Sequence, residues 1–371
     1  MATKNLFHKL TLVVPTYSRQ EFVVRLMRFW KKGTVRLIVL DGSPSPVLEQ
    51  TLREVGKNFT YIHDQGGLYH RLGLALEILE TDYVALAGDD EFYLPAAVGS
   101  CLEFLEANPD HISCIGRALG FGCWEGRVFG ATQYPKLAGY AVEQESPRDR
   151  AVSHLGDYVP SMIYSVVRRE AWVDSLRVVT QAEFPFFAAG ELQMEILLSA
   201  GGKSRVLPHL YWLRSKGETP PIRGSDMSLD EKNRLWDWWE TTPSAEKEDF
   251  LDRMAEGVER VASEPVEDPR GLVLQACEAY LSAQSAKRKS GGRRAVARKA
   301  SRLLPPAFHE PLKQWYRHRN GGGTRQRGQQ TLTEAARELE AEGVTVAWEE
   351  LAEVERAVEE FHAVRRQRYG I

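Results

Sequence analysis

Residues 83–92 have the sequence YVALAGDDEF, an apolar run that ends in a cluster of acids. The run has the length and composition of a buried strand and stops at Gly88, directly before Asp89, Asp90 and Glu91. Like charges repel, so three adjacent acids are an unfavourable choice for a purely structural strand end. A bound divalent cation would remove this repulsion, because hard cations take oxygen ligands. A solvated acidic turn is the alternative interpretation.

The chain before this cluster alternates between short apolar runs and stretches with helical periodicity. The pattern predicts strands at residues 10–14, 35–40, 59–62 and 83–87, separated by helices at 21–32, 47–55 and 68–79. Strands that alternate with helices in this way predict an α/β fold with a doubly wound, mostly parallel sheet.

Polar residues follow three of the predicted strands. Pro15 and Thr16 end the first, Asp41 ends the second, and the acid cluster ends the fourth. In doubly wound sheets, ligands bind beyond the carboxyl ends of the strands. The sequence therefore predicts a ligand site at this edge of the sheet.

Length and composition limit the class of protein. A chain of 371 residues exceeds one ordinary domain, so a core domain with an extension is expected. The four cysteines lack metal-ligand spacing, and no run approaches membrane-spanning length. The net charge of -3 does not by itself indicate a polyanionic partner. These features predict a reduced, cytoplasmic protein whose membrane contact, if any, is peripheral.

Four segments resemble, in order and spacing, the signatures of inverting, family 2-like glycosyltransferases with the GT-A fold. They are residues 14–19 (VPTYSR), 40–43 (LDGS), 88–91 (GDDE) and 190–195 (GELQME). Residues 158–169 are similar to the acceptor-side strand of that family, which ends at a basic residue. The resemblance covers roughly residues 8–215.

The resemblance implies transfer of a sugar from a nucleotide-diphosphate sugar to a glycan, lipid-linked or other acceptor, as in surface polysaccharide or glycoconjugate synthesis. Pro15, Thr16 and Arg19 would line the nucleotide, with Arg19 able to meet a phosphate. Asp41 would bond the base or ribose. Arg71 would be a second phosphate partner, or else a solvated helix residue. The acid cluster, Asp89 included, would hold Mg²⁺ or Mn²⁺ against the diphosphate.

The metal cluster departs from the family pattern at Ala87, where members often have the first acid. The ligands would then be Asp89 with Glu91, or Asp90 with either neighbour.

The base motif departs at Leu192, where the family usually supplies the aspartate that takes the acceptor's proton. Glu191 is the nearest substitute and the predicted base. Glu195 lies one helical turn further on the same face. A structural role for Glu191 at the start of a helix is the alternative.

After residue 225 the pattern indicates helices without strands, so residues 1–225 are predicted as the catalytic domain and 226–371 as a helical extension. Residues 287–327 hold thirteen Lys or Arg against one acid, interleaved with apolar side chains. This amphipathic basic segment could contact anionic lipid, nucleic acid or a phosphorylated glycan, or be a linker without a partner. Residues 332–368 are predicted as an acidic helical tail that folds back on the basic segment or pairs with another subunit of a homo-oligomer.

Three other functions fit parts of the pattern. A transferase could act on a modified nucleic acid base or a peptide, docked by the basic segment. A catalytically weak nucleotide-sugar-binding or scaffold protein would account for Ala87 and Leu192. A nucleotidyltransferase also holds a metal with strand-end acids, but its first loop is normally Gly-rich, and residues 15–19 contain no Gly.

Overall fold

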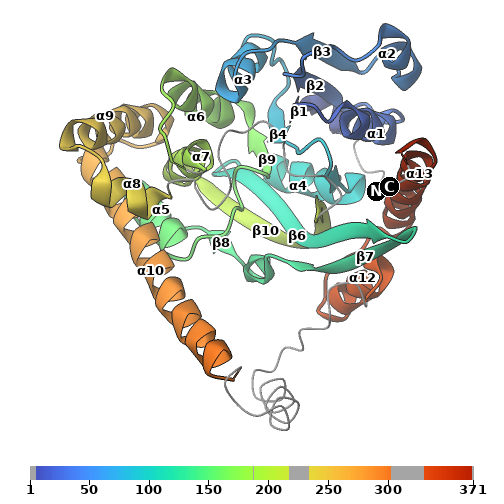
Figure 1. Ribbon diagram of the computed structural model, residues 1–371. Coiled ribbons are helices and arrows are strands. Elements are labelled where there is room, and N and C mark those ends of the chain that lie inside the picture. Colours follow the sequence, from blue (N-terminus) through green and yellow to red (C-terminus); the bar gives the residue numbers. More distant parts are fainter. Residues whose placement is uncertain (1–5, 187, 217–233, 302–329, 370–371) are drawn as a thin grey trace.

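One mixed sheet organises the protein (Figure 1). The computed structural model describes residues 6–186, 188–216, 234–301 and 330–369, with the backbone alone for 286–301. Within these residues, ten strands form a sheet in the order β3-β2-β1-β4-β9-β6-β10-β5, with β7 added to β6 and β8 to β10.

The strands and helices have the following bounds. The strands are β1 (Leu10–Thr16), β2 (Arg36–Asp41), β3 (Phe59–His63), β4 (Tyr83–Leu86), β5 (Phe92–Tyr93), β6 (His111–Trp124), β7 (Arg127–Gln133), β8 (Ala141–Val142), β9 (Val166–Arg168) and β10 (Lys203–Ser215). The helices are α1 (Gln20–Trp30), α2 (Glu49–Val55), α3 (Leu68–Leu76), α4 (Pro95–Ala107), α5 (Pro147–Gly156), α6 (Arg169–Gln181), α7 (Ala189–Gly201), α8 (Leu235–Thr241), α9 (Ser244–Val261), α10 (Pro269–Ser301), α12 (Leu332–Ala341) and α13 (Trp348–Tyr369).

The first four strands are parallel, as the sequence predicts. β1 lies between β2 and β4, and its last residue, Thr16, is in register with Asp41 at the end of β2. The antiparallel strand β9 joins this half to β6, which pairs in parallel with β10. The predicted order of strands and helices up to β4 is confirmed, and the polar strand ends share one edge.

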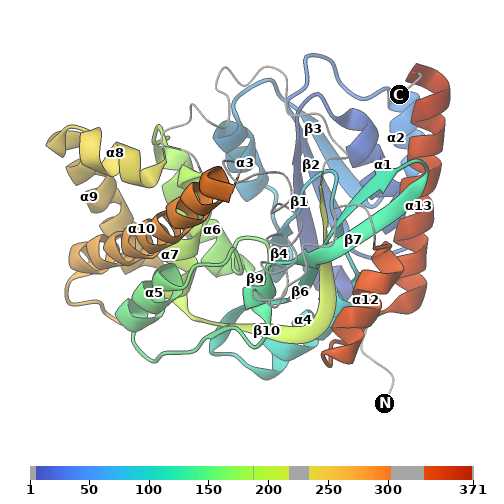
Figure 2. The same ribbon diagram turned by 60° about the horizontal axis from the view of Figure 1, so that its bottom comes forward.

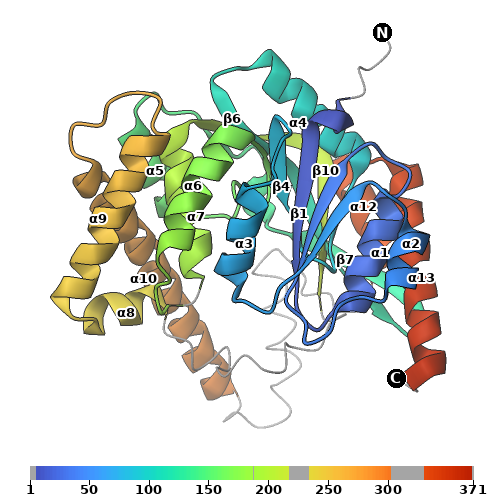
Figure 3. The same cartoon turned by 90° about the horizontal axis from the view of Figure 1, so that it is seen from above.

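Alternating side chains of β1 enter two apolar layers. Leu10, Leu12 and Val14 belong to a core shared with α1, α4 and the C-terminal helices. Val13, on the other face, packs into a cluster with α3, α6 and α7. Figure 3 shows α3, α6 and α7 on one side of the sheet and α1, α12 and α13 on the other. The two-sided burial explains why these strands are continuous apolar runs.

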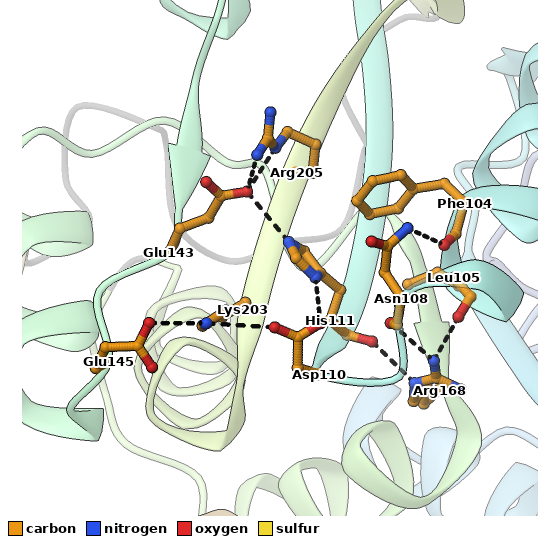
Figure 4. A network of polar contacts seen from close by, with 10 residues as sticks. All are labelled: Phe104, Leu105, Asn108, Asp110, His111, Glu143, Glu145, Arg168, Lys203 and Arg205. Atoms are coloured by element: carbon orange, nitrogen blue, oxygen red, sulfur yellow. Dashed lines mark hydrogen bonds and ion pairs between the residues drawn. The ribbon is translucent and has the colours of Figure 1, made fainter.

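A polar network lies at the opposite edge of the sheet from the polar strand ends (Figure 4). Arg168, the basic residue that ends the predicted acceptor-side strand, belongs to it. Because β9 runs antiparallel to β4, Arg168 lies beside Tyr83 at the start of β4. Its guanidinium donates to the backbone carbonyls of Leu105, Asn108 and His111 at 2.6–3.2 Å. The predicted strand thus ends at a basic residue, and Arg168 fixes the α4–β6 connection; the acceptor-side role of the strand stays a prediction.

The helices after β10 form two separate groups. α8, α9 and α10 share an apolar cluster with α5 and α7. α12 and α13 pack instead against β7, β6 and α1, and their residues Leu332, Val354 and Val358 are fully buried in the main core. Figure 2 shows α13 lying along α1 and β7. The apolar face of this tail is used within the chain, and its predicted contact with the basic segment or with a second subunit stays a prediction.

Three further expectations concern the basic segment, the division into two domains and membrane contact. The basic segment 287–327 lies outside the described residues, apart from the helical backbone up to residue 301. The division at residue 225 stays a prediction. None of the described helices has an apolar stretch long enough to cross a membrane. In the described part of the chain, none of the four cysteines forms a disulfide.

Candidate active site

The ends of β1 and β4 are joined by a buried hydrogen bond. Thr16 Oγ1 donates to Asp89 Oδ2 at 2.7 Å. Pro15 precedes it in β1 and is partly buried. Asp89 is 5% exposed, and burial raises the pKa of its carboxyl to about 7 against the opposing effects of Arg19 and Thr16. The predicted strand-end residues are therefore in direct contact.

Arg19 lies between two of the acids. Its Nη2 atom is 2.6 Å from Asp89 Oδ1 and 2.7 Å from Asp90 Oδ2. The two carboxylates thus converge on one positively charged atom. The backbone carbonyl of Asp90 also accepts a hydrogen bond from Arg25 Nη2 at 3.0 Å.

Glu91 has different partners from the acids before it. Its Oε2 accepts a hydrogen bond from Trp212 Nε1 at 2.7 Å, and its Oε1 lies 3.4 Å from Arg214 Nε. Burial raises the pKa of the Glu91 carboxyl to about 7. Both partners come from the end of β10, so the three consecutive acids divide into a pair and a single group.

The pair Asp89 and Asp90 fits a divalent cation better than any combination that includes Glu91. Their oxygens already meet at one cationic atom of Arg19, and carboxylate oxygens suit Mg²⁺ and Mn²⁺. Ala87 is buried in the main core and offers no ligand. Within the described part of the chain, no three His, Cys, Asp or Glu residues form a group able to hold a metal by themselves. A cation on this pair would need further oxygens, as a diphosphate provides.

Asp41 is fully buried, and the protein itself uses both of its oxygens. Oδ1 accepts from the backbone N–H of Ser43 at 2.8 Å. Oδ2 accepts from Gln20 Nε2 at 2.6 Å and from the Tyr61 hydroxyl at 2.5 Å. Asp41 therefore orders the loop after β2, and its predicted contact with the base or ribose stays a prediction.

Arg71 is also buried, and it binds the ends of β1 and β2 together. Its Nη1 donates to the carbonyls of Thr16 and Leu40 at 2.8 and 2.7 Å, and its Nε donates to Gly66 at 3.1 Å. Burial lowers the pKa of the guanidinium. A methyl group on Gly42 would lie 2.5 Å from Arg71 Cζ, so the loop passes too close for any side chain. Arg71 is not a solvated helix residue, and a role at a phosphate stays a prediction.

Glu191, the predicted base, lies in the first turn of α7 between two tyrosines. Its Oε1 accepts from the Tyr158 hydroxyl at 2.5 Å, and its Oε2 accepts from the Tyr164 hydroxyl at 3.3 Å. Burial raises the pKa of this carboxyl above its ordinary value, although both hydroxyls oppose the shift. A carboxylate with a raised pKa is a suitable proton acceptor.

The neighbours of Glu191 in α7 are directed elsewhere. Leu192 packs into the cluster of α8, α9 and α10, so an acid there would lie in an apolar layer. Glu195 is fully buried and bonds His154. Among these three residues, the arrangement favours Glu191 as the one that acts on a ligand.

An aromatic wall joins the acid cluster to Glu191. The ring of Trp212, which bonds Glu91, lies 4.8 Å from the ring of Tyr164, which bonds Glu191. Tyr134 stacks on the ring of Trp212, with the two ring centroids 5.4 Å apart. Glu91 and Glu191, separated by a hundred residues in sequence, are therefore linked through two aromatic residues of one wall.

In the described part of the chain, three of the four residues other than glycine with a positive φ lie around the same place, and the fourth is Glu125 in the β6–β7 turn. Ser18, Tyr134 and Ala188 have φ of 54°, 50° and 61°, values that non-glycine residues seldom adopt. Ser18 precedes Arg19, Tyr134 packs on Trp212, and Ala188 begins the turn that carries Glu191. Strained backbone of this kind is concentrated at functional sites.

The sequence does not predict which residues contact the acids. Trp212 and Arg214 lie at the end of β10, so the strand-end rule applied to that strand would have found them. Tyr158 and Tyr164 lie in an irregular segment, and no local pattern marks them.

One family model matches part of the chain. Residues 11–152 match the model of glycosyl transferase family 2. No curated protein matches the chain at a significant level.

Two of the similar solved structures show the degree of likeness. S. aureus TarS 1–349 in complex with UDP-GlcNAc is 14% identical with a TM-score of 0.44, over 76% of this chain and 92% of that one. The mannosyltransferase PcManGT from Pyrobaculum calidifontis, in complex with GDP-Man and Mn2+, is 13% identical with a TM-score of 0.39, over 83% and 82%. Likeness at this level carries no substrate from one protein to another. The match of residues 11–152 to glycosyl transferase family 2 agrees with the resemblance that the sequence signatures indicate.

Proposed function

We propose that the protein transfers a sugar from a nucleotide-diphosphate donor to an acceptor hydroxyl, with a divalent metal at one end of its site and a carboxylate base at the other. The observation that carries this proposal is the aromatic wall, on which Glu91 and Glu191 are joined through Trp212 and Tyr164. Sugar transfer needs acids with two tasks close together: some bind the metal at the donor, and another takes the proton of the acceptor.

The donor end is formed by Thr16, Arg19, Asp89 and Asp90. The acid pair would hold Mg²⁺ or Mn²⁺, which supplies positive charge against the leaving diphosphate. Arg19 has the charge and position to meet a phosphate oxygen, and Thr16 keeps Asp89 in place. Asp41 and Arg71 hold the loops that would border the nucleotide.

The acceptor end is formed by Glu191 and its two tyrosines. The acceptor oxygen would attack the anomeric carbon, the bond from that carbon to the diphosphate oxygen would break, and the acceptor's proton would pass to Glu191. Attack opposite the leaving group inverts the anomeric configuration. Burial of Glu191 supports the role, because it raises the basicity of the carboxylate.

The acceptor itself is proposed from the sequence alone. A surface polysaccharide or other glycoconjugate made at the cytoplasmic side of a membrane fits the basic segment 287–327, which would contact anionic lipid. Liposome binding that salt and deletion of 287–327 both leave unchanged would remove the lipid part of this proposal.

A donor panel tests the activity. UDP-, GDP-, dTDP- and CDP-sugars would be offered with Mn²⁺, with Mg²⁺ and with a chelator, and nucleotide release followed. We expect one nucleotide class to be turned over only with metal. Metal-dependent donor binding without turnover would favour a catalytically weak nucleotide-sugar-binding protein. Donor binding of equal strength with and without metal would contradict the proposed donor end.

A further inference from the structure

A buried polar chain lies beneath the proposed base. Glu195 Oε2 is 2.7 Å from His154 Nε2, and both side chains have no exposed surface. His154 Nδ1 is 2.7 Å from the hydroxyl of Tyr140. With hydrogen on Nε2, the imidazole donates to the carboxylate and accepts from the tyrosine, so each member of the chain is satisfied.

Glu195 also binds backbone. Its carboxylate oxygens accept from the N–H groups of Met162 and Ile163 at 3.2–3.3 Å. These two residues lie in the irregular segment that carries Tyr158 and Tyr164. Helix α7 therefore binds this segment at two positions. Glu195 accepts from the backbone of the segment, and Glu191, one turn earlier in the helix, accepts from the tyrosines of the segment.

We propose that Glu195, His154 and Tyr140 are positioning residues for the transfer reaction, which set the segment 158–164 so that its tyrosines orient Glu191. The proposal rests on the proposed function, because it assigns a task relative to Glu191 as base. It adds three residues that touch neither donor nor acceptor.

Leaving any residue of the chain Glu195–His154–Tyr140 without its hydrogen-bond partner would cost free energy. A buried carboxylate without hydrogen-bond donors is strongly unfavourable. The N–H groups of Met162 and Ile163 therefore have to stay at the Glu195 carboxylate, which fixes the position of the segment. Fully satisfied buried networks select a single geometry, whereas partly satisfied ones loosen. A loosened segment would let Tyr158 and Tyr164 leave Glu191, and a base that is misplaced by a fraction of an ångström loses rate.

The helical extension supports the same segment from outside. The ring of Tyr280, in α10, lies 5.3 Å from that of Tyr158 in an edge-on arrangement. The segment is thus fixed by α7 on one side and packed by α10 on the other.

The test uses the full-length protein with three variants, Glu195→Gln, Tyr140→Phe and Tyr158→Phe, and with Tyr83→Phe as matched control. Tyr83 is a buried tyrosine whose hydroxyl donates to Glu106 at the opposite edge of the sheet. We expect Glu195→Gln to lower kcat at least about tenfold, with the donor Kd within about twofold of the parent value. Tyr140→Phe should lower kcat less, and Tyr83→Phe should leave it unchanged.

The pH profile of kcat distinguishes positioning from simple stability. The negative charge of Glu195 raises the pKa of Glu191, whereas the Tyr158 hydroxyl lowers it. Glu195→Gln should therefore move the acidic limb to lower pH, and Tyr158→Phe should move it to higher pH. If the role were purely structural, the two substitutions would change thermal stability and leave the acidic limb of the kcat profile in place in both variants.

Other outcomes would overturn the inference. If Glu191→Gln abolishes transfer while Glu195→Gln and Tyr140→Phe keep the parent kcat and pH profile, the positioning proposal is wrong and the base assignment stands. If Glu191→Gln itself leaves transfer intact, the proposed mechanism and this inference are both wrong. Where Glu195→Gln does not fold, Tyr140→Phe decides, because it removes one hydroxyl and keeps the ring.

Discussion

At the scale of single residues, the three neighbouring acids differ in what holds them. Asp89 and Asp90 share Arg19, whereas Glu91 is bound to Trp212 and Arg214. Their order in sequence therefore does not give their roles. Distant residues, brought up by β10 and by the loop after β1, assign them.

Exchange of each acid for its amide tests this division. We expect Asp89→Asn and Asp90→Asn to weaken Mn²⁺-dependent donor binding by about tenfold or more, because each removes a charged ligand. Glu91→Gln should have the smaller effect on metal affinity, since its carbonyl can still accept from Trp212. Calorimetric titration of donor with and without Mn²⁺ measures this, with Glu106→Gln, at the other edge, as control. The reverse ranking would make Glu91 the metal ligand.

Glu191 gives a prediction for pH as well as for rate. Burial raises its pKa, so the folded protein binds a proton that the unfolded chain has released, and stability falls as the pH rises through this interval. The base must be ionised, so kcat rises over the same interval. We expect Glu191→Gln to lower kcat by about 10² to 10⁴ fold and to be at least as stable as the parent at pH 8.

Urea unfolding at pH 5 and pH 8 provides the check. The parent should lose more of its unfolding free energy than Glu191→Gln between the two pH values. Equal losses would mean that Glu191 does not titrate as its burial indicates.

At the scale of elements, the loops after β1 and β2 are held by the close packing of Arg71 against Gly42. Gly42→Ala should destabilise the protein by about 1–3 kcal/mol, because the methyl group meets the guanidinium. Gly73→Ala in α3 is the matched control: nothing lies within 4 Å, and alanine favours the helix by up to about 1 kcal/mol. Chemical unfolding of both variants tests this, and equal stability would contradict the contact.

The last helix also reaches the acid cluster. The guanidinium of Arg25 lies over the rings of Phe22, Phe92 and Phe361, and it donates to the carbonyl of Asp90. Phe361→Ala should therefore cost about 1–3 kcal/mol and weaken Mn²⁺-dependent donor binding. Val364→Ala, at an exposed position of the same helix, should do neither. Normal donor binding by Phe361→Ala would separate α13 from the site.

At the scale of the whole molecule, the end of the chain completes the core that its beginning starts. Leu332, Val354 and Val358 are fully buried with Leu10 and Leu12. We expect a protein cut after residue 225 to expose this apolar surface and to aggregate or unfold, as size-exclusion chromatography and circular dichroism would show. A stable, monomeric fragment that binds donor would instead support an independent domain.

The sequence predicts the first half of the fold well, because its strands and helices are local patterns. The apolar runs at 10–14 and 83–87 form the strands β1 and β4, and the polar residues after them lie at one edge of the sheet. Contacts between residues far apart in sequence cannot be predicted from such local patterns. That Arg168 lies at the far edge depends on the reversed direction of β9, and that α12 and α13 cover β7 depends on packing. The tyrosines at Glu191 come from a segment without periodicity.

We propose above that transfer proceeds with inversion from a metal-bound nucleotide sugar, with Glu191 as base. NMR of the anomeric proton during donor turnover with Mn²⁺ measures it most directly, for the parent protein and for Glu191→Gln. We predict that the first sugar product has the opposite anomeric configuration to the donor, and that Glu191→Gln forms it at least about a hundredfold more slowly. A product of retained configuration, or an unchanged rate in Glu191→Gln, would contradict the account.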